Sequence, residues 1–137
     1  MAKKDPQVLR LKITLEHVEP APWREIEIRS DKTLPHLHDA IQAAFLWYDM
    51  HLWDFGIGDR KYQMKSEDFW VEPMWGPPVM EVTTKKVDFF LKTKVPPVIY
   101  TYDFGDDWMH RVELISKRSV VPNEPLPRFV GGQWATP

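Results

Sequence analysis

Apolar and polar residues alternate along two segments near the N-terminus, which is the pattern of half-buried β-strands. Residues 8–17 form the first segment, with polar side chains between four apolar ones: Leu9, Leu11, Ile13 and Leu15. Residues 23–30 form the second, in which Ile26 and Ile28 alternate with charged residues. The prolines between the segments lack the N–H donor that a strand ladder needs. The pattern predicts two antiparallel strands joined by a proline-stiffened connection.

A helical spacing replaces the alternation after residue 30. Asp31 or Thr33 is expected to be the N-cap, and Pro35 fits the first turn, where an N–H would have no partner. Apolar residues then recur three and four positions apart: Leu34, Leu37, Ile41, Ala44, Phe45 and Tyr48. The spacing predicts one helix over about residues 34–46, with this stripe packed against a sheet.

The middle of the chain carries shorter signals. Residues 51–58 have a period of two, with Trp53, Phe55 and Ile57 on one face. Gly58-Asp59 is typical of a turn, and residues 61–64 are expected to form the return strand. Residues 65–79 predict a long loop and residues 80–84 a short strand. Residues 86–92 predict either a strand or the end of a helix.

Residues 98–116 contain two alternating runs that predict a hairpin. A two-residue turn would put the two apolar sets on opposite faces of the sheet. The three-residue loop 105–107 puts them on one face, and we expect this odd-length loop. The predicted cross-strand pairs are Phe104 with Trp108, Tyr102 with His110, and Tyr100 with Val112.

These segments together predict the fold class α+β, with a mostly antiparallel sheet packed on one main helix at about 34–46. The length of 137 residues suits a single domain over residues 1–137, and 43% apolar with 28% charged residues is an ordinary globular balance. No cysteine is present, which excludes disulfides and thiolate metal sites. The net charge of −2 disfavours a strongly basic nucleic-acid-binding domain.

The chain shows no recognisable targeting or membrane segment. Residues 1–7 are polar and charged, unlike a signal peptide. The longest mostly apolar stretch, residues 40–48, is far shorter than a bilayer crossing requires. We therefore expect a cytoplasmic protein without a membrane partner.

The tip of the predicted hairpin holds the clearest candidates for chemistry. Asp103, Asp106 and His110 are close in the sequence, and carboxylates with imidazole are ligands for divalent metals as well as general acids and bases. One interpretation is therefore a metal or acid–base site. The other, which we prefer, is that aspartate and glycine shape the turn while His110 packs among aromatic residues.

A second candidate combines three histidines. His38 lies in the predicted helix, His51 opens the next strand and His110 lies in the hairpin, so a three-histidine site requires helix and hairpin to meet. The chain has no His-Glu-x-x-His motif, and buried histidine is common without a metal. We assign no catalytic residue and predict no cofactor. A divalent metal stays an open alternative, with these weak candidate ligands: Asp103, Asp106, His110, His38 and His51.

Seven tryptophans in so short a chain indicate a dense aromatic core, an adhesive surface, or both. Tryptophan is enriched at protein interfaces, and aromatic residues interleaved with lysine and arginine also form platforms for single-stranded nucleic acid. The acidic net charge favours a core with a dimer interface. Motifs of nucleotide-dependent or serine-nucleophile chemistry, such as a Walker loop or a Gly-x-Ser-x-Gly elbow, are absent.

Two blocks of the chain resemble the plasmid pRiA4b ORF-3-like family, some members of which are labelled insertion-element passenger proteins of the TnpR type. Residues 11–15, 22–24, 33–44 and 51–55 carry the first block. The second is residues 100–114, Tyr-Thr-Tyr-Asp-Phe-Gly-Asp-Asp-Trp-Met-His-Arg-Val-Glu-Leu. The resemblance implies a compact α+β fold and brings no established activity. The mobile-element label reflects genetic neighbourhood, and the nucleophilic serine context of a resolvase is absent.

The resemblance also implies a difference at the C-terminus. Relatives usually continue past the segment that aligns with residues 129–137 into a Pro-Glu-Asp-x-Gly-Gly stretch and a final helix. We therefore expect this chain to lack the family's C-terminal segment, either as a natural short form or by truncation.

The leading functional hypothesis is a non-catalytic interaction module that forms a homodimer or binds a protein partner through exposed aromatic residues. The first alternative is a metal-dependent, hydrolase-like enzyme in which Asp103 or Asp106 holds the ion and His110 is a ligand or a general base. The second alternative is a nucleic-acid-binding accessory protein linked to mobile elements.

Overall fold

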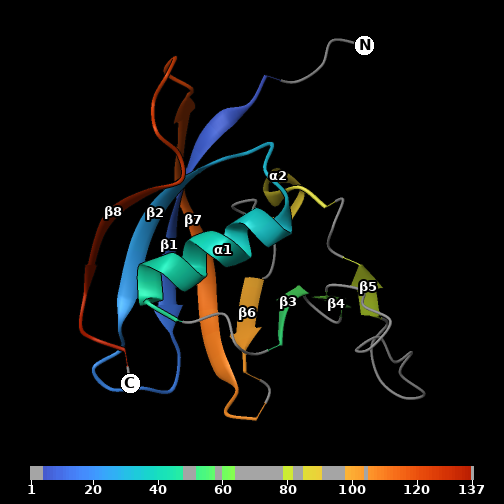
Figure 1. Cartoon of the computed structure of the whole chain (residues 1–137), viewed down its shortest axis with the longest axis vertical. Coiled ribbons are helices and arrows are strands. Elements are labelled where there is room, and N and C mark those ends of the chain that lie inside the picture. The colour runs from blue at the N-terminus through green and yellow to red at the C-terminus, as the bar shows by residue number, and fades with distance from the viewer. Residues whose placement is uncertain are drawn as a thin grey trace.

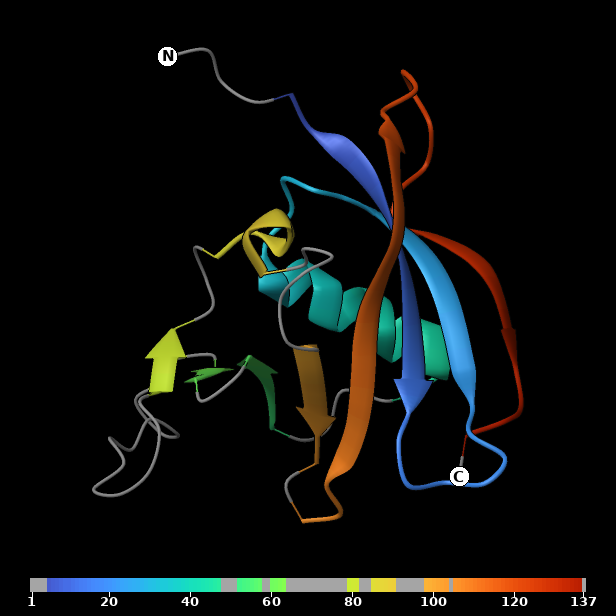
Figure 2. The same ribbon diagram turned by 180° about the vertical axis from the view of Figure 1, so that it is seen from behind.

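The computed structural model of the chain describes residues 5–47, 52–57, 60–63, 79–81, 85–90, 98–103 and 105–136. Its elements are β1 (Gln7–Leu15), β2 (Trp23–Arg29), α1 (Leu34–Phe45), β3 (Trp53–Ile57), β4 (Arg60–Gln63), β5 (Val79–Glu81), α2 (Val87–Phe90), β6 (Val98–Tyr102), β7 (Trp108–Ser119) and β8 (Arg128–Gln133). The described strands form one sheet in the order β5-β4-β3-β6-β7-β1-β2-β8. Helix α1 lies across one face of this sheet (Figure 1), and the view from behind shows the strands in front of it (Figure 2).

Strand β1 lies inside the sheet, between β2 and β7, and pairs with both in antiparallel fashion. Its four alternating apolar residues are fully buried, and Leu11 lies opposite Ile26 of β2 and Leu114 of β7. Every described pairing is antiparallel except that of β4 with β5. The predicted strand pair and the mostly antiparallel sheet are confirmed.

Helix α1 matches the predicted boundaries closely. Thr33 is the N-cap residue, but its hydroxyl contacts Nδ1 of His36 at 2.8 Å instead of a backbone N–H. The predicted apolar stripe is buried at Leu34, Leu37, Ile41 and Phe45, and this stripe with the inward face of the sheet forms the core. None of the described helices is long and apolar enough to cross a membrane.

The last carbonyls of α1 all have partners, two of them from distant parts of the chain. A helix leaves its final four C=O groups without intrahelical partners. Here each accepts a hydrogen bond: Gln42 from the N–H of Trp47 at 2.9 Å, Ala43 from the N–H of Leu46 at 3.3 Å, Ala44 from Nε of Arg24 at 3.0 Å, and Phe45 from Oγ1 of Thr136 at 3.2 Å. The C-terminal end of the helix is thereby joined to β2 and to the residues after β8.

The middle of the chain agrees with the expectations where it is described. Strands β3, β4 and β5 occupy the predicted strand regions, and α2 shows that residues 87–90 are helical. The strand alternative for that segment is therefore wrong. Tyr48, the predicted Gly58-Asp59 turn and residues 65–78 of the predicted loop lie outside the described residues.

The register of the β6–β7 hairpin differs from the prediction by two residues. Tyr102 pairs with Trp108, Tyr100 with His110, and Val98 with Val112, so five residues connect the strands. The predicted pairs Tyr102–His110 and Tyr100–Val112 are wrong, and Phe104 lies outside the described residues. Asp103 leaves the β6–β7 ladder because its φ is 63° and its carbonyl accepts hydrogen bonds from the N–H groups of Asp106 and Asp107 in the loop. Because five is also odd, the apolar sets still share one face, as expected.

Candidate functional site

Tyr100 of β6 links the helix to the hairpin through buried polar contacts. Its hydroxyl oxygen lies 2.6 Å from Nδ1 of His38 and accepts a hydrogen bond from Nε2 of Gln42 at 2.9 Å. His38 and Gln42 are four residues apart on α1, so both reach the same oxygen. Because the amide N–H donates to it, the hydroxyl can donate to His38. His38 also stacks on Trp53, with ring centroids 4.1 Å apart.

His110 of β7 is fully buried, and both of its ring nitrogens have partners. Nδ1 lies 3.0 Å from the carbonyl oxygen of Tyr100, and Nε2 lies 3.1 Å from Nε1 of Trp47. Because a carbonyl only accepts and an indole N–H only donates, the imidazole is neutral with its proton on Nδ1. Burial lowers the pKa of His110 to about 4, against smaller opposing effects of hydrogen bonds with the backbone. Both nitrogens are thus used within the protein.

Asp103 uses its carboxylate to shape the hairpin loop. Its Oδ1 accepts hydrogen bonds from the backbone N–H groups of Gly105 at 3.1 Å and Asp106 at 3.4 Å. The carbonyl of Asp103 also accepts from the N–H groups of Asp106 and Asp107. Asp103 and Asp107 are left-handed, with φ of 63° and 53°, a conformation that aspartate tolerates better than most residues. The preferred interpretation, aspartate as a turn residue, accounts for these contacts.

The predicted metal ligands do not converge in the described part of the chain. His38 and His110 both contact Tyr100, so helix and hairpin do meet. The side chain of Asp106 is exposed in the loop, whereas His110 is in the core. Among the described residues, no three side chains of histidine, aspartate or glutamate are placed to hold a metal ion. His51 lies outside the described residues.

Asp54 of β3 is a buried carboxylate that the sequence patterns do not single out. Burial raises its pKa, and Asp107 adds to this rise, while Lys61 and Gln63 act in the opposite direction. Nζ of Lys61 lies 4.0 Å from Oδ2 of Asp54. Asp54 alternates with the core residue Phe55, so it lies on the face of the sheet away from α1.

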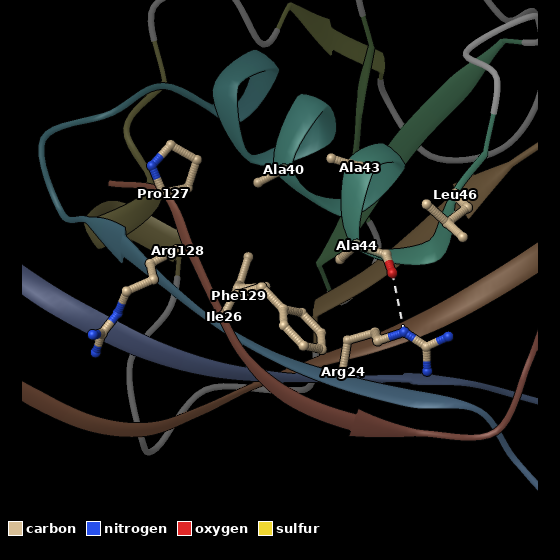
Figure 3. Close-up of a pocket in the computed structure, with 9 residues that line it drawn as sticks. All are labelled: Arg24, Ile26, Ala40, Ala43, Ala44, Leu46, Pro127, Arg128 and Phe129. Atoms are coloured by element: carbon tan, nitrogen blue, oxygen red, sulfur yellow. Dashed lines mark hydrogen bonds between the residues drawn. The ribbon is translucent and has the colours of Figure 1, made fainter. Parts of the chain in front are cut away.

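A groove opens where α1 passes over the last two strands of the sheet, and we call it the α1–β8 groove (Figure 3). Its volume is about 380 Å³, within the range of ligand sites. Nine residues line it: Arg24, Ile26, Ala40, Ala43, Ala44, Leu46, Pro127, Arg128 and Phe129. In Figure 3 three alanines of α1 form one side, and Ile26 and Phe129 lie across from them. The lining is apolar apart from two arginines.

Arg24 is fixed at the end of this groove by backbone oxygens. Nε donates to Ala44 at 3.0 Å, and Nη1 donates to Trp23 at 2.8 Å and to Gln133 at 3.1 Å. The guanidinium carbon lies 5.0 Å from the ring centroid of Phe45. No carboxylate in the described part of the chain pairs with Arg24, and burial lowers its pKa. The arginine is therefore positioned without being neutralised.

The other arginine of the groove, Arg128, is neutralised. Its Nη2 pairs with Oε1 of Glu27, and Oε2 of Glu27 also accepts from Nε of Arg118 at 3.0 Å. In Figure 3 the Arg128 side chain points away from the alanines of the helix. Among the described residues of the lining, Arg24 is thus the cation that no carboxylate neutralises.

Gly132 of β8 gives Arg24 its space. A Cβ atom at this position would lie 2.6 Å from the carbonyl oxygen of Trp23 and 2.7 Å from Cδ of Arg24, both too close for a real contact. A Cβ atom at the neighbouring Gly131 would have nothing within 4 Å. Gly132 therefore permits a close approach of β8 to β2 that a larger residue would prevent.

The sequence analysis missed the groove, although one signal for it was present. Arg24 occupies the same alternation phase as Ile26 and Ile28, which places a cation on the face of β2 that packs against the helix. A charged residue in an apolar phase predicts a special environment. The alanines and Phe129 carry no comparable signal, because small helical residues and a single aromatic residue are common anywhere.

Comparison with known proteins shows what this chain is similar to. A model of the plasmid pRiA4b ORF-3-like protein family matches residues 7–137. The chain belongs to this family. The uncharacterized protein y4hQ of Sinorhizobium fredii is 31% identical over 138 residues, which cover 93% of this chain and 68% of y4hQ. Neither the description of the family nor the name of y4hQ states an activity.

A solved structure has the same fold. It is the protein of unknown function MM3350 from Methanosarcina mazei Go1, with a TM-score of 0.82 and 25% sequence identity. The match covers 96% of this chain and 72% of MM3350. The predicted family resemblance is confirmed for this chain, and MM3350 shares its fold.

Proposed function

We propose that this chain is a non-catalytic interaction module that docks a segment of a partner protein in the α1–β8 groove. The observation that carries the proposal is the position of large exposed apolar side chains. Leu46 and Phe129 line the groove and are 77% and 59% exposed. Trp134, 51% exposed, follows Gln133, whose carbonyl binds Arg24. Single exposed apolar residues are ordinary, but a contiguous apolar surface with a groove is typical of an interaction site.

The chemistry of the groove supports binding without catalysis. The described residues of its lining include no carboxylate, imidazole, hydroxyl or thiol, so they offer no acid, base or nucleophile for a reaction. Of the three candidate histidines, His38 and His110 are in the core and make hydrogen bonds inside the protein, and His51 lies outside the described residues. The groove therefore supports the leading hypothesis, an interaction module.

Charge favours a different protein over a second copy of this chain. A symmetric dimer uses the same surface on both subunits, so contact through the groove would enclose two copies of Arg24, and the described lining offers no carboxylate to pair with either. Like charges that are partly desolvated repel each other across such an interface. A partner segment without excess positive charge meets no such penalty.

The test is site-specific photo-crosslinking followed by reconstitution. A photoreactive phenylalanine analogue placed at position 129 or 46 should crosslink one partner in cells, which mass spectrometry identifies. The purified partner should bind the wild-type chain, and a variant with Leu46→Ser and Phe129→Ser should weaken binding at least ~10-fold because apolar anchors are lost. Val121→Ser is the matched control, since Val121 is 55% exposed and does not line the groove. Equal binding by both variants would refute the proposal, and sedimentation would reveal self-association instead.

A further inference from the structure

We infer that the docked segment carries a carboxylate that pairs with Arg24, next to an apolar side chain that fills the groove. This inference rests on the proposed function and adds the chemistry of the ligand. It assigns Arg24 as the residue that selects acidic partners.

The guanidinium of Arg24 has N–H groups that donate to no described residue. Arginine has five N–H groups in a planar fork. Three of them, one on Nε and two on Nη1, are used by the carbonyls of Ala44, Trp23 and Gln133. Both N–H groups of Nη2 have no hydrogen-bond partner among the described residues. These two N–H groups point in different directions, so a carboxylate oxygen would accept one charge-assisted hydrogen bond from Nη2.

The positive charge of Arg24 also has no counter-ion among the residues that the structure describes. Its three partners are neutral carbonyl oxygens, which orient the group but do not cancel its charge. Three other arginines of the sheet are paired: Arg10 with Glu25 at 2.6 Å, Arg111 with Glu16 at 2.7 Å and Arg118 with Glu124 at 2.8 Å. Arg24 stands apart from this pattern, and a ligand carboxylate would complete it.

Arg24 is held in place before any ligand arrives. Three hydrogen bonds and the ring of Phe45 hold the guanidinium, and Gly132 leaves space for its Cδ. A long side chain that is already ordered loses little conformational freedom on binding. A free arginine on the surface would lose much more. The side chain is thus preorganised as an anion anchor.

The apolar requirement comes from the rest of the groove. The side chains of Ala40, Ala43 and Ala44 are methyl groups, and with Ile26 and Phe129 they make most of the lining of this groove of about 380 Å³ apolar. Arg128 adds no second anchor because Glu27 already pairs with it. The expected motif is therefore one large apolar residue close to one acidic residue, in a segment of the partner protein.

The experiment is an NMR titration of the full chain with two capped pentapeptides, one with phenylalanine followed by aspartate and one with asparagine in place of the aspartate. The alanine methyl groups of the groove and the Nε–H of Arg24 are the reporters. We expect the acidic peptide to shift both sets of signals and to bind about 10-fold more tightly than the neutral peptide, because a charged hydrogen bond replaces a neutral one. This comparison needs no variant, so folding defects cannot affect it.

Variants of the chain then test whether Arg24 causes the preference for the acidic peptide. Arg24→Gln should abolish the preference for the acidic peptide, whereas the matched variant Arg128→Gln should keep it, since Arg128 is paired with Glu27. Arg24→Lys retains the charge and should keep part of the preference. A preference that survives Arg24→Gln would overturn the inference.

The remaining outcomes separate this inference from the proposed function. If both peptides bind equally at the alanines, the groove docks apolar segments without an anion anchor and only the inference fails. If neither peptide shifts the groove but the crosslinked partner still depends on Leu46 and Phe129, the carboxylate inference is again wrong while docking stands. If free phenylpropionate binds and the peptides do not, the ligand is a small organic acid, and both the protein source and the proposed function fail.

Discussion

Helix α1 faces two regions of opposite chemical character. On one side, His38 and Gln42 meet Tyr100, which in turn contacts His110, and these buried polar side chains are bonded within the protein. On the other side, Ala40, Ala43 and Ala44 border the α1–β8 groove, where apolar surface is exposed and Arg24 has no carboxylate partner among the described residues.

The difference between the two regions separates stability from binding. Buried polar groups with complete partners make a packed unit that is costly to disturb. Exposed apolar groups and an unpaired cation contribute little to folding and are available to a ligand. Removal of similar side chains should therefore have very different consequences on the two sides of α1.

The largest expected effect is that of Tyr100→Ala. The substitution removes a fully buried ring and the hydroxyl partner of His38 and Gln42, so both a cavity and unsatisfied polar groups result. We expect a loss of about 3–5 kcal/mol in the free energy of unfolding, by analogy with other large aromatic residues in cores. Urea denaturation followed by tryptophan fluorescence measures it. A loss below about 1 kcal/mol would mean that the buried contacts around Tyr100 contribute little to the stability of the fold.

The next effect is a loss of stability at acidic pH that His110 causes. Burial holds the pKa of His110 at about 4, below the value of 6.5 of an unfolded histidine. Between these pH values the unfolded chain binds a proton that the folded chain does not, so stability falls as pH decreases from 6.5 to 4. The shift corresponds to about 3 kcal/mol.

Urea denaturation of the wild type and of His110→Gln at a series of pH values isolates this contribution. The difference in unfolding free energy between the two proteins should change through this range and level off above pH 7. The carboxylates titrate in both proteins and cancel. A difference that is independent of pH would show that His110 is not desolvated in the folded chain.

A smaller effect is expected from substitution of Gly132, and the neighbouring Gly131 of β8 provides its control. Gly132→Ala should cost about 1–3 kcal/mol, since the new methyl group would overlap the Trp23 carbonyl and Cδ of Arg24. It should also weaken binding of the acidic peptide, because Arg24 must move. Gly131→Ala, where nothing lies within 4 Å of the added atom, should leave unfolding and binding unchanged. Equal effects of the two substitutions would contradict the close approach at Gly132.

The smallest expected effect is that of Phe129→Ala. The ring is 59% exposed, so its removal should change the free energy of unfolding by no more than about 0.5 kcal/mol. Thermal and urea denaturation should not distinguish the variant from the wild type. A loss of about 2 kcal/mol or more would make Phe129 part of the core and weaken its role as a docking residue.

Much of the fold is predictable from the sequence because local patterns and burial agree. The alternation at Leu9–Leu15 and the spacing of Leu34, Leu37 and Ile41 each identify an element and its buried face. The hairpin register is not predictable in this way. Asp103 has a φ of 63° and its carbonyl accepts from the N–H groups of Asp106 and Asp107, so the turn begins two residues earlier than the alternation indicates.

The sites are less predictable than the elements. The acidic hairpin and the histidines stand out in the sequence, yet His110 and Asp103 make their hydrogen bonds inside the fold. The groove depends on residues from α1, β2 and β8, which come together only in three dimensions. Of these, Arg24 alone has a sequence signal, its charged side chain in an apolar phase of β2.

The strand order has a consequence for synthesis on the ribosome. Ile13 of β1 pairs with Val112 of β7, and Arg24 of β2 pairs with Gly132 of β8. Strands β1 and β2 therefore cannot complete their pairing until β7 and β8 have been synthesised. At the usual rate of translation, β1 and β2 emerge from the ribosome on the order of ten seconds before β7 and β8. During that interval the early hairpin has an apolar face and two open edges. Nascent chains stalled before β7 should therefore be recognised by chaperones far more strongly than chains stalled after β8.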